Sequence, residues 1–112
     1  MEENFDKEQL QMVSMEIILA AGDARSHIHG AFADMRSGAF KEASQKLDDA
    51  HESIKQAHAA QTSLLQKLAN GVPFEVDILL VHAQDHLMTT MTLHEMSKEM
   101  LFMHKKMRTF SV

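Results

Sequence analysis

The scarcity of residues that break helices is the feature that most limits the folds open to this chain. Its 112 residues include one proline and four glycines, and breaks fall at "SGAF" (residues 37–40) and "NGVPF" (residues 70–74). Glycine and proline are the strongest local markers of turns, so their rarity favours long helices over strands and turns. The breaks leave three segments, which we expect to be helical over about residues 7–35, 40–69 and 75–107.

Apolar residues in the first two segments recur at the spacing of one helix face. In the second segment the spacing alternates between three and four residues, which is the heptad pattern of helices that pack along their length. The residues of this seam are Phe40, Ala43, Leu47, Ala50, Ile54, Ala57, Gln61, Leu64 and Leu68. The corresponding stripe of the first segment is Val13, Ile17, Ala20, Ala24, Ile28, Ala31 and Met35. We therefore expect an all-α fold, an antiparallel three-helix bundle, in one domain that covers residues 1–112.

The third segment carries apolar residues on more than one face. Its first stripe is Ile78, His82, Asp85, Thr89, Thr92, Met96, Met100, Met103 and Met107, and a second apolar stripe contains Leu80, Leu87 and Met91. A helix in a three-helix monomer buries one side only, so the additional apolar side predicts self-association. We expect the methionines to pack between helices or subunits.

Composition excludes several classes of function. A net charge of −5 argues against a nucleic-acid-binding protein, because phosphate contacts need a basic surface. The absence of cysteine excludes disulfides, thiolate chemistry and zinc sites built on cysteine. The beginning "MEENFDKEQL" lacks the features of a secretory signal, and no apolar run approaches the ~20 residues that span a bilayer. We expect a cytoplasmic protein with no direct membrane insertion.

A group of polar residues interrupts the apolar string "LLVHAQDHLMTTM" (residues 79–91). His82, Asp85, His86 and Thr89 are spaced by three and four residues and share one face of a helix. Three interpretations compete. The group is a hydrogen-bonded layer that determines helix register, a metal site built on a histidine pair, or a site where one histidine attacks a phosphoryl group and holds it as a phosphoramidate.

The remaining polar candidates have simpler interpretations. Surface positions are expected for His27 and His29, and exposed or partly buried positions for His94 and His104. His51 and His58 share a face of the second segment, where His58 is a candidate for a supporting role. Gln61 lies on the same seam and could face the polar group of the third segment.

Three strings resemble one enzyme family in order and spacing. "VHAQDHLMTTM" (residues 81–91) resembles the active-site signature of the IIA enzymes of the lactose/cellobiose (lactose/chitobiose) family, part of the phosphoenolpyruvate-dependent sugar phosphotransferase system. "IILAAGDARS" (residues 17–26) resembles the first-helix pattern of a small residue, Gly, any residue and Ala-Arg-Ser. "EASQKLDDAHESIKQAHAAQTSLL" (residues 42–65) resembles the second helix, in which Ala-His is followed by Gln-Thr.

The resemblance implies specific roles for three residues. His82 would be phosphorylated on Nε2 by the phosphocarrier HPr and would pass the group to a cysteine of a IIB protein. His86 would be a hydrogen-bonding neighbour in the active site. Asp85 would lie on the three-fold axis of a homotrimer of nine helices, where three carboxylates bind one divalent cation, expected to be Mg²⁺. A hard cation offsets the repulsion between carboxylates. Gln84 belongs to the signature, and we assign it no role.

Under this resemblance the chain is a phosphotransferase that carries a phosphoryl group and never contacts the sugar. The sugar is selected by the membrane component IIC, and Ala83 favours cellobiose or chitobiose over lactose, whose proteins more often carry glycine there. The residues alone also leave a rival hypothesis open. In that rival the chain is a non-enzymatic helical oligomer whose polar layer is structural or binds a metal.

Overall fold

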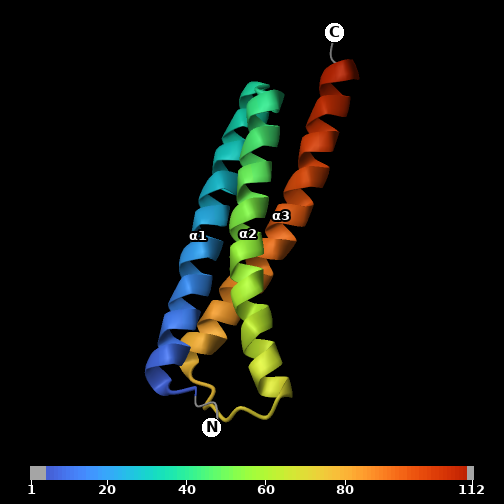
Figure 1. Cartoon of the computed structure of the whole chain (residues 1–112). Coiled ribbons are helices and arrows are strands. Elements are labelled where there is room, and N and C mark those ends of the chain that lie inside the picture. The colour runs from blue at the N-terminus through green and yellow to red at the C-terminus, as the bar shows by residue number, and fades with distance from the viewer. Residues whose placement is uncertain (1–4, 111–112) are drawn as a thin grey trace.

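Three long helices form an elongated bundle in the computed structural model, which describes residues 5–110 (Figure 1). Helix α1 spans Lys7–Ser37, α2 spans Phe40–Ala69 and α3 spans Ile78–Phe110. Helices α1 and α2 are antiparallel neighbours, and α3 runs in the direction of α1 before its C-terminal part diverges from both (Figure 1). The predicted all-α three-helix bundle is therefore confirmed. None of the helices in the described residues is both long and apolar enough to cross a membrane.

Side-chain caps and left-handed residues determine where the first two helices begin and end. The Asp6 carboxylate accepts the Gln9 backbone N–H at 2.8 Å, and the Gln9 side chain accepts the Asp6 N–H at 2.9 Å. This reciprocal arrangement satisfies backbone donors at the start of α1. Helix α1 continues past the predicted residue 35 to Ser37, where Gly38 with φ 80° takes the left-handed conformation. Helix α2 has the predicted bounds, and Gly71 after it has φ 76°.

Helix α3 begins at Ile78 rather than at the predicted residue 75, and it ends at Phe110 rather than at residue 107. The later start follows from Asp77, whose side chain accepts the Leu80 backbone N–H at 2.9 Å. An aspartate in this position satisfies a backbone donor of the first turn and so defines the helix start. The backbone carbonyl of the same residue accepts the Val81 N–H at 3.1 Å, which is the first intrahelical bond.

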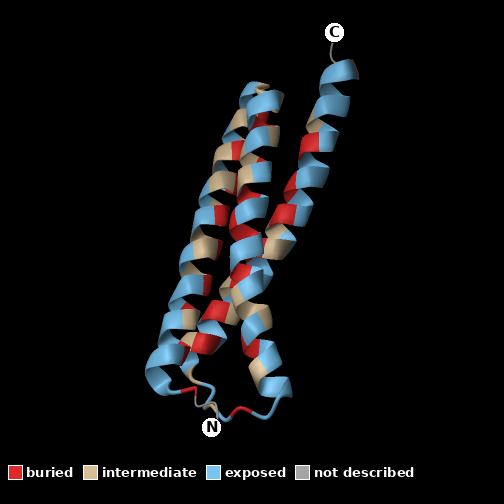
Figure 2. Ribbon diagram, viewed as in Figure 1, coloured by how far each residue is buried: buried red, intermediate tan, exposed pale blue. Residues whose placement is uncertain are grey.

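The core follows the predicted seams with local exceptions (Figure 2). On α2 the buried seam residues are Ala43, Leu47, Ala50, Ile54, Ala57 and Leu64. Gln61 is only half-buried, and Leu68 is 60 % exposed in the last turn. On α1 the predicted Ala20 is half-buried, and its neighbour Ala21 is fully buried instead. Periodicity therefore identified the packed face of α1 and α2, with a shift of one residue at this position.

The two faces of α3 have opposite environments within one protomer. The packed face is Leu80, Ala83, Leu87, Thr90, His94, Ser97 and Leu101. The opposite face, here called the outward stripe, is Ile78, His82, Asp85, Thr89, Thr92, Met96, Met100, Met103 and Met107, and every member is exposed. The prediction of apolar residues on two sides is confirmed, since Ile78 is 87 % and Met103 58 % exposed. Within one protomer these methionines do not pack between helices, which leaves packing between subunits, the other arrangement expected for them.

Candidate functional site

The N-terminal third of α3 places the predicted polar residues on one surface. His82 is exposed and His86, one turn later, is half-buried. Their imidazole rings stack with centroids 6.0 Å apart and planes inclined by 16°. The spacing of four residues puts the two rings on the same side of the helix. The structure therefore brings together the two histidines that the sequence singled out, with His82 the more accessible.

Asp85 lies on the outward stripe between the two histidines in sequence. Its side chain is exposed, and no ion pair involves it within residues 5–110. Its backbone carbonyl accepts the Thr89 hydroxyl at 2.8 Å. The described residues of one protomer contain no group of three side chains placed to hold a metal ion. A cation at Asp85 would therefore need ligands from other copies of the chain.

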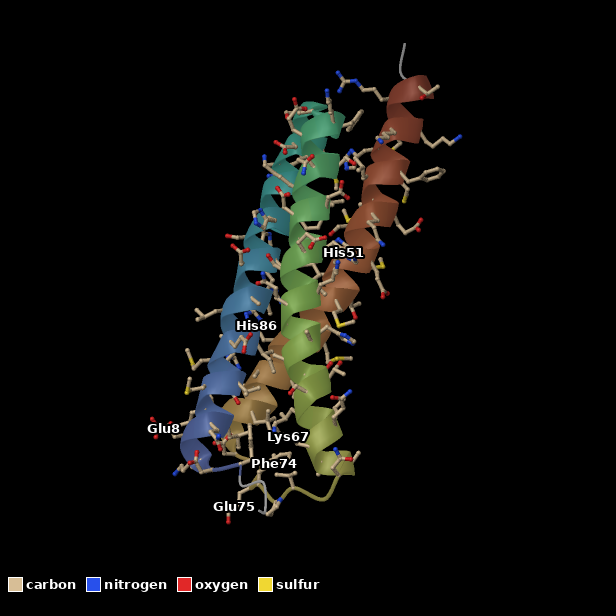
Figure 3. All side chains as sticks on the ribbon, viewed as in Figure 1. Glu8, His51, Lys67, Phe74, Glu75 and His86 are labelled. Carbon is tan, nitrogen blue, oxygen red and sulfur yellow. The ribbon has the colours of Figure 1, made fainter. Side chains whose placement is uncertain are left out.

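Residues of α1 border His86 on its buried side (Figure 3). A Cβ atom added at Gly22 would lie 3.8 Å from His86 Nε2, an ordinary van der Waals distance, so the ring lies directly beside this part of α1. Burial lowers the pKa of His86, and the guanidinium of Arg25 lowers it further. The carboxylate of Asp85 acts in the opposite direction. The ring is consequently neutral at pH 7, with one nitrogen that donates and one that accepts.

Arg25 is a site residue to which sequence reasoning assigned no role. It is half-buried on α1, and its Nη1 donates to Thr89 Oγ1 across a distance of 3.3 Å. The Thr89 hydroxyl in turn donates to the carbonyl of Asp85 or, at 3.2 Å, to that of His86. The sequence does contain a signal for this residue, because Arg25 belongs to the string "GDARS" that resembles the first-helix pattern of the family. The pattern does not say which residue the arginine contacts.

Helix α2 contributes an amide contact rather than a histidine. Gln61 Nε2 donates a short hydrogen bond to the Gln84 side-chain oxygen, and it also lies 3.8 Å from Met88 Sδ. Gln61 therefore reaches the third helix as expected, but through Gln84 instead of the histidine pair. His58, the candidate for a supporting role, is exposed on α2, and none of its polar contacts is to His82 or His86.

The structure corrects the expectation for one other histidine. His94 is buried, and its Nε2 lies 2.9 Å from the Leu47 carbonyl oxygen on α2. Its ring also stacks with that of His51, at 5.8 Å between centroids and 25° between planes. The expected surface position is confirmed for His29, which is exposed. His27 is half-buried, and its Nε2 lies 3.4 Å from Asp23 Oδ2.

The chemistry available at this site is that of an accessible imidazole next to a second, neutral one. A neutral imidazole has a lone pair that can attack an electrophilic centre. Of the two imidazoles, His82 is the one exposed to an approaching electrophile. A nearby guanidinium and the N–H of His86 are donors suited to an anionic group.

Comparison with known proteins agrees with this chemistry. Residues 12–105 match the family model described as "PTS system, Lactose/Cellobiose specific IIA subunit". The lichenan-specific phosphotransferase enzyme IIA component of Bacillus subtilis is 41 % identical over 99 residues, which are 88 % of this chain and 90 % of that protein.

Solved structures agree as well. The crystal structure of PtcA from S. mutans matches with a TM-score of 0.88 and 50 % identity, and the match covers 89 % of this chain and 98 % of that one. The IIA(Chitobiose) structure in complex with HPr, from the Escherichia coli phosphotransferase system, gives a TM-score of 0.73 and 34 % identity over 88 % of this chain and 96 % of that one.

Proposed function

Because the chain belongs to the lactose/cellobiose-specific IIA family of the sugar phosphotransferase system, we propose that His82 is the residue on which it carries the phosphoryl group. The donor is phospho-HPr, and the acceptor is a cysteine of a IIB protein, both in the cytoplasm. The E. coli relative solved with HPr supports the first partner. The single observation that carries the proposal is the exposed His82 ring stacked on a half-buried, neutral His86.

Two displacements at phosphorus make up the transfer. In the first, the lone pair of a His82 ring nitrogen attacks phosphorus while the bond to the donor breaks, and its electron pair returns to the donor. In the second, the sulfur of a IIB cysteine attacks as a thiolate, the nitrogen–phosphorus bond breaks and its electron pair returns to His82. The neutral His86 ring donates its N–H to a phosphoryl oxygen. Such transfers depend mainly on positioning and on stabilisation of charge.

The direct test is incubation with phosphoenolpyruvate, enzyme I and HPr, followed by mass spectrometry. The wild-type chain should gain the mass of one phosphoryl group, and His82→Ala should gain none. His29→Ala is the matched control, because that histidine is exposed on α1 and has no place in the site. Equal labelling of His82→Ala and the control would contradict the proposal and favour the rival of a purely structural or metal-binding oligomer.

We also propose that three copies assemble through the outward stripe of α3 and share a divalent cation at Asp85. The stripe supports this, because it exposes four methionines at one-turn spacing, and a carboxylate oxygen is the ligand type that Mg²⁺ prefers. The donor set fits the ion only when it is shared, since one protomer supplies a single carboxylate. The cation, when bound, would neutralise part of the repulsion between the three carboxylates.

Light scattering of Asp85→Leu tests both parts of this assembly. We expect a trimer that no longer requires the cation, because the substitution removes the repulsion and adds apolar surface. Glu16→Leu is a control, since this carboxylate is exposed on α1 and lies outside the outward stripe. A monomeric Asp85→Leu would show that the metal, rather than apolar packing, holds the copies together.

For the sugar, we propose a β-glucoside disaccharide such as cellobiose or chitobiose. The family description and the relative named for lichenan support this class. Ala83 is fully buried on the packed face of α3, so it marks the branch of the family without touching a partner. Transfer rates to purified IIB proteins of cellobiose and lactose systems would decide between them. Faster transfer to the lactose protein would overturn the assignment.

A further inference from the structure

We propose that Arg25 provides the positive charge that holds the phosphoryl oxygens while the group resides on His82. This inference rests on the proposed function and adds a catalytic residue to it. Arg25 lies on α1, three residues after the Gly22 that faces His86, and its side chain points along α3 to Thr89. The guanidinium therefore belongs to the same surface as the histidine pair, although it lies on a different helix.

The charge of Arg25 is not neutralised by a carboxylate within the described part of the protomer. The ion pairs there join His27 to Asp23, Lys46 to Asp34 and Lys55 to Glu52. The hydrogen bond described for the guanidinium goes to a neutral hydroxyl and is long, at 3.3 Å. An arginine has five N–H donors arranged as a planar fork that matches phosphate geometry. Most of this donor capacity remains for an anion at the site.

The phosphoryl group is the anion that the proposed function brings to this surface. When the His82 nitrogen attacks phosphorus and the donor's bond breaks, negative charge on the three phosphoryl oxygens arrives next to the histidine pair. Arg25 exchanges the weak Thr89 contact for hydrogen bonds to these oxygens, which are shorter and roughly twice as strong when both partners are charged. Arg25 also lowers the pKa of His86, as expected for a guanidinium that lies close to the histidine pair.

Steady-state transfer from phospho-HPr tests the role. In Arg25→Gln we expect kcat to fall by about 10²-fold, the effect of removing one donor to developing charge, with a smaller change in KM. Arg25→Lys, which retains the charge without the fork, should recover part of the loss. Arg36→Gln is the matched control, because this arginine is exposed in the last turn of the same helix, and it should keep the wild-type kcat.

Two further measurements separate charge from structure. Thr89→Val removes the hydroxyl that holds Arg25 and should lower kcat far less than Arg25→Gln does. A loss of the same size in both variants would overturn the inference, because Arg25 would then act only by tying α1 to α3. Equal kcat in Arg25→Gln and Arg36→Gln would also overturn it, as would dissociation of the assembly in Arg25→Gln alone. If His82→Ala is still labelled, the proposed function fails, whereas normal transfer by Arg25→Gln alone rejects only this inference.

Discussion

Two histidine pairs, one within α3 and one between α2 and α3, have nearly the same ring geometry and opposite surroundings. The rings of His82 and His86 are 6.0 Å apart at 16°, and those of His51 and His94 are 5.8 Å apart at 25°. The first pair lies within one helix and exposes His82. The second joins two helices, and His94 is buried with its Nε2 at the Leu47 carbonyl oxygen.

The difference shows that stacking does not make a histidine reactive. His94 is held by a hydrogen bond that occupies Nε2, and burial keeps an electrophile away from its ring. His82 keeps an open ring face because its helix turns it away from α1 and α2. We therefore predict a structural role for the His51–His94 pair, here called the upper pair, and a chemical role for the His82–His86 pair, here called the lower pair.

The largest effect expected from this comparison is on stability. His94→Ala should lower the free energy of unfolding by about 2–3 kcal/mol, because it empties a buried space and removes the bond to the Leu47 carbonyl. His82→Ala should change it by no more than about 0.5 kcal/mol, as for most exposed positions. Urea unfolding at one protein concentration measures both, since assembly makes stability depend on concentration. Similar losses in the two variants would remove the distinction between the pairs.

The second-largest effect is expected in how fast a reagent modifies the two rings, His82 and His94. We expect diethyl pyrocarbonate to acylate His82 at least about tenfold faster than His94, whose ring reacts only when the helices open locally. Mass spectrometry of proteolytic fragments gives the two rates. In denaturing urea the rates should converge, which controls for intrinsic reactivity. A fast reaction at His94 in the folded protein would mean that its buried contact is not maintained.

A smaller effect tests what holds His94 in place. His51→Ala removes the stacked ring but leaves the hydrogen bond to the Leu47 carbonyl, and we expect a loss of about 0.5–1 kcal/mol. His58→Ala, on the same helix and exposed, is the control and should have almost no effect. If His51→Ala destabilises as much as His94→Ala, stacking rather than the hydrogen bond accounts for the upper pair.

The smallest effect concerns the space beside His86. Gly22→Ala should raise the free energy of unfolding by about 0.5 kcal/mol, because alanine favours a helix interior and its Cβ would meet His86 Nε2 at an ordinary 3.8 Å. The ring signals of His86 in an NMR spectrum should shift, while those of His94 should not. Loss of stability would indicate that the lower pair is packed more tightly than the structure has it.

Much of the fold could be predicted from the sequence because helix signals are local. The seam of α2, its end before Gly71 and the two apolar sides of α3 all depend on spacing within one segment. The start of α3 was placed too early because the capping role of Asp77 depends on a contact that spacing does not specify. For the methionines the sequence left two arrangements open, between helices or between subunits, because periodicity does not say which apolar side faces α1 and α2.

The site could be predicted only where its members lie close together in the chain. His82, Asp85 and His86 are within two turns of one helix, so spacing and family resemblance placed them together. Arg25 is 64 residues from Thr89, and the register between α1 and α3 that joins them is set by packing along both helices. His94 was misplaced although its spacing of four residues from Thr90 and three from Ser97 puts it on the packed face.

The outward stripe of α3 has a consequence for how such a chain can change. Residues proposed to hold copies together and the residue proposed to receive phosphate follow one another along the same ridge, with Ile78 and Asp85 each about one turn from His82. A substitution selected for firmer association at either of these positions would also alter the surroundings of the nucleophile. Quaternary structure and turnover are therefore expected to vary together among descendants of this sequence.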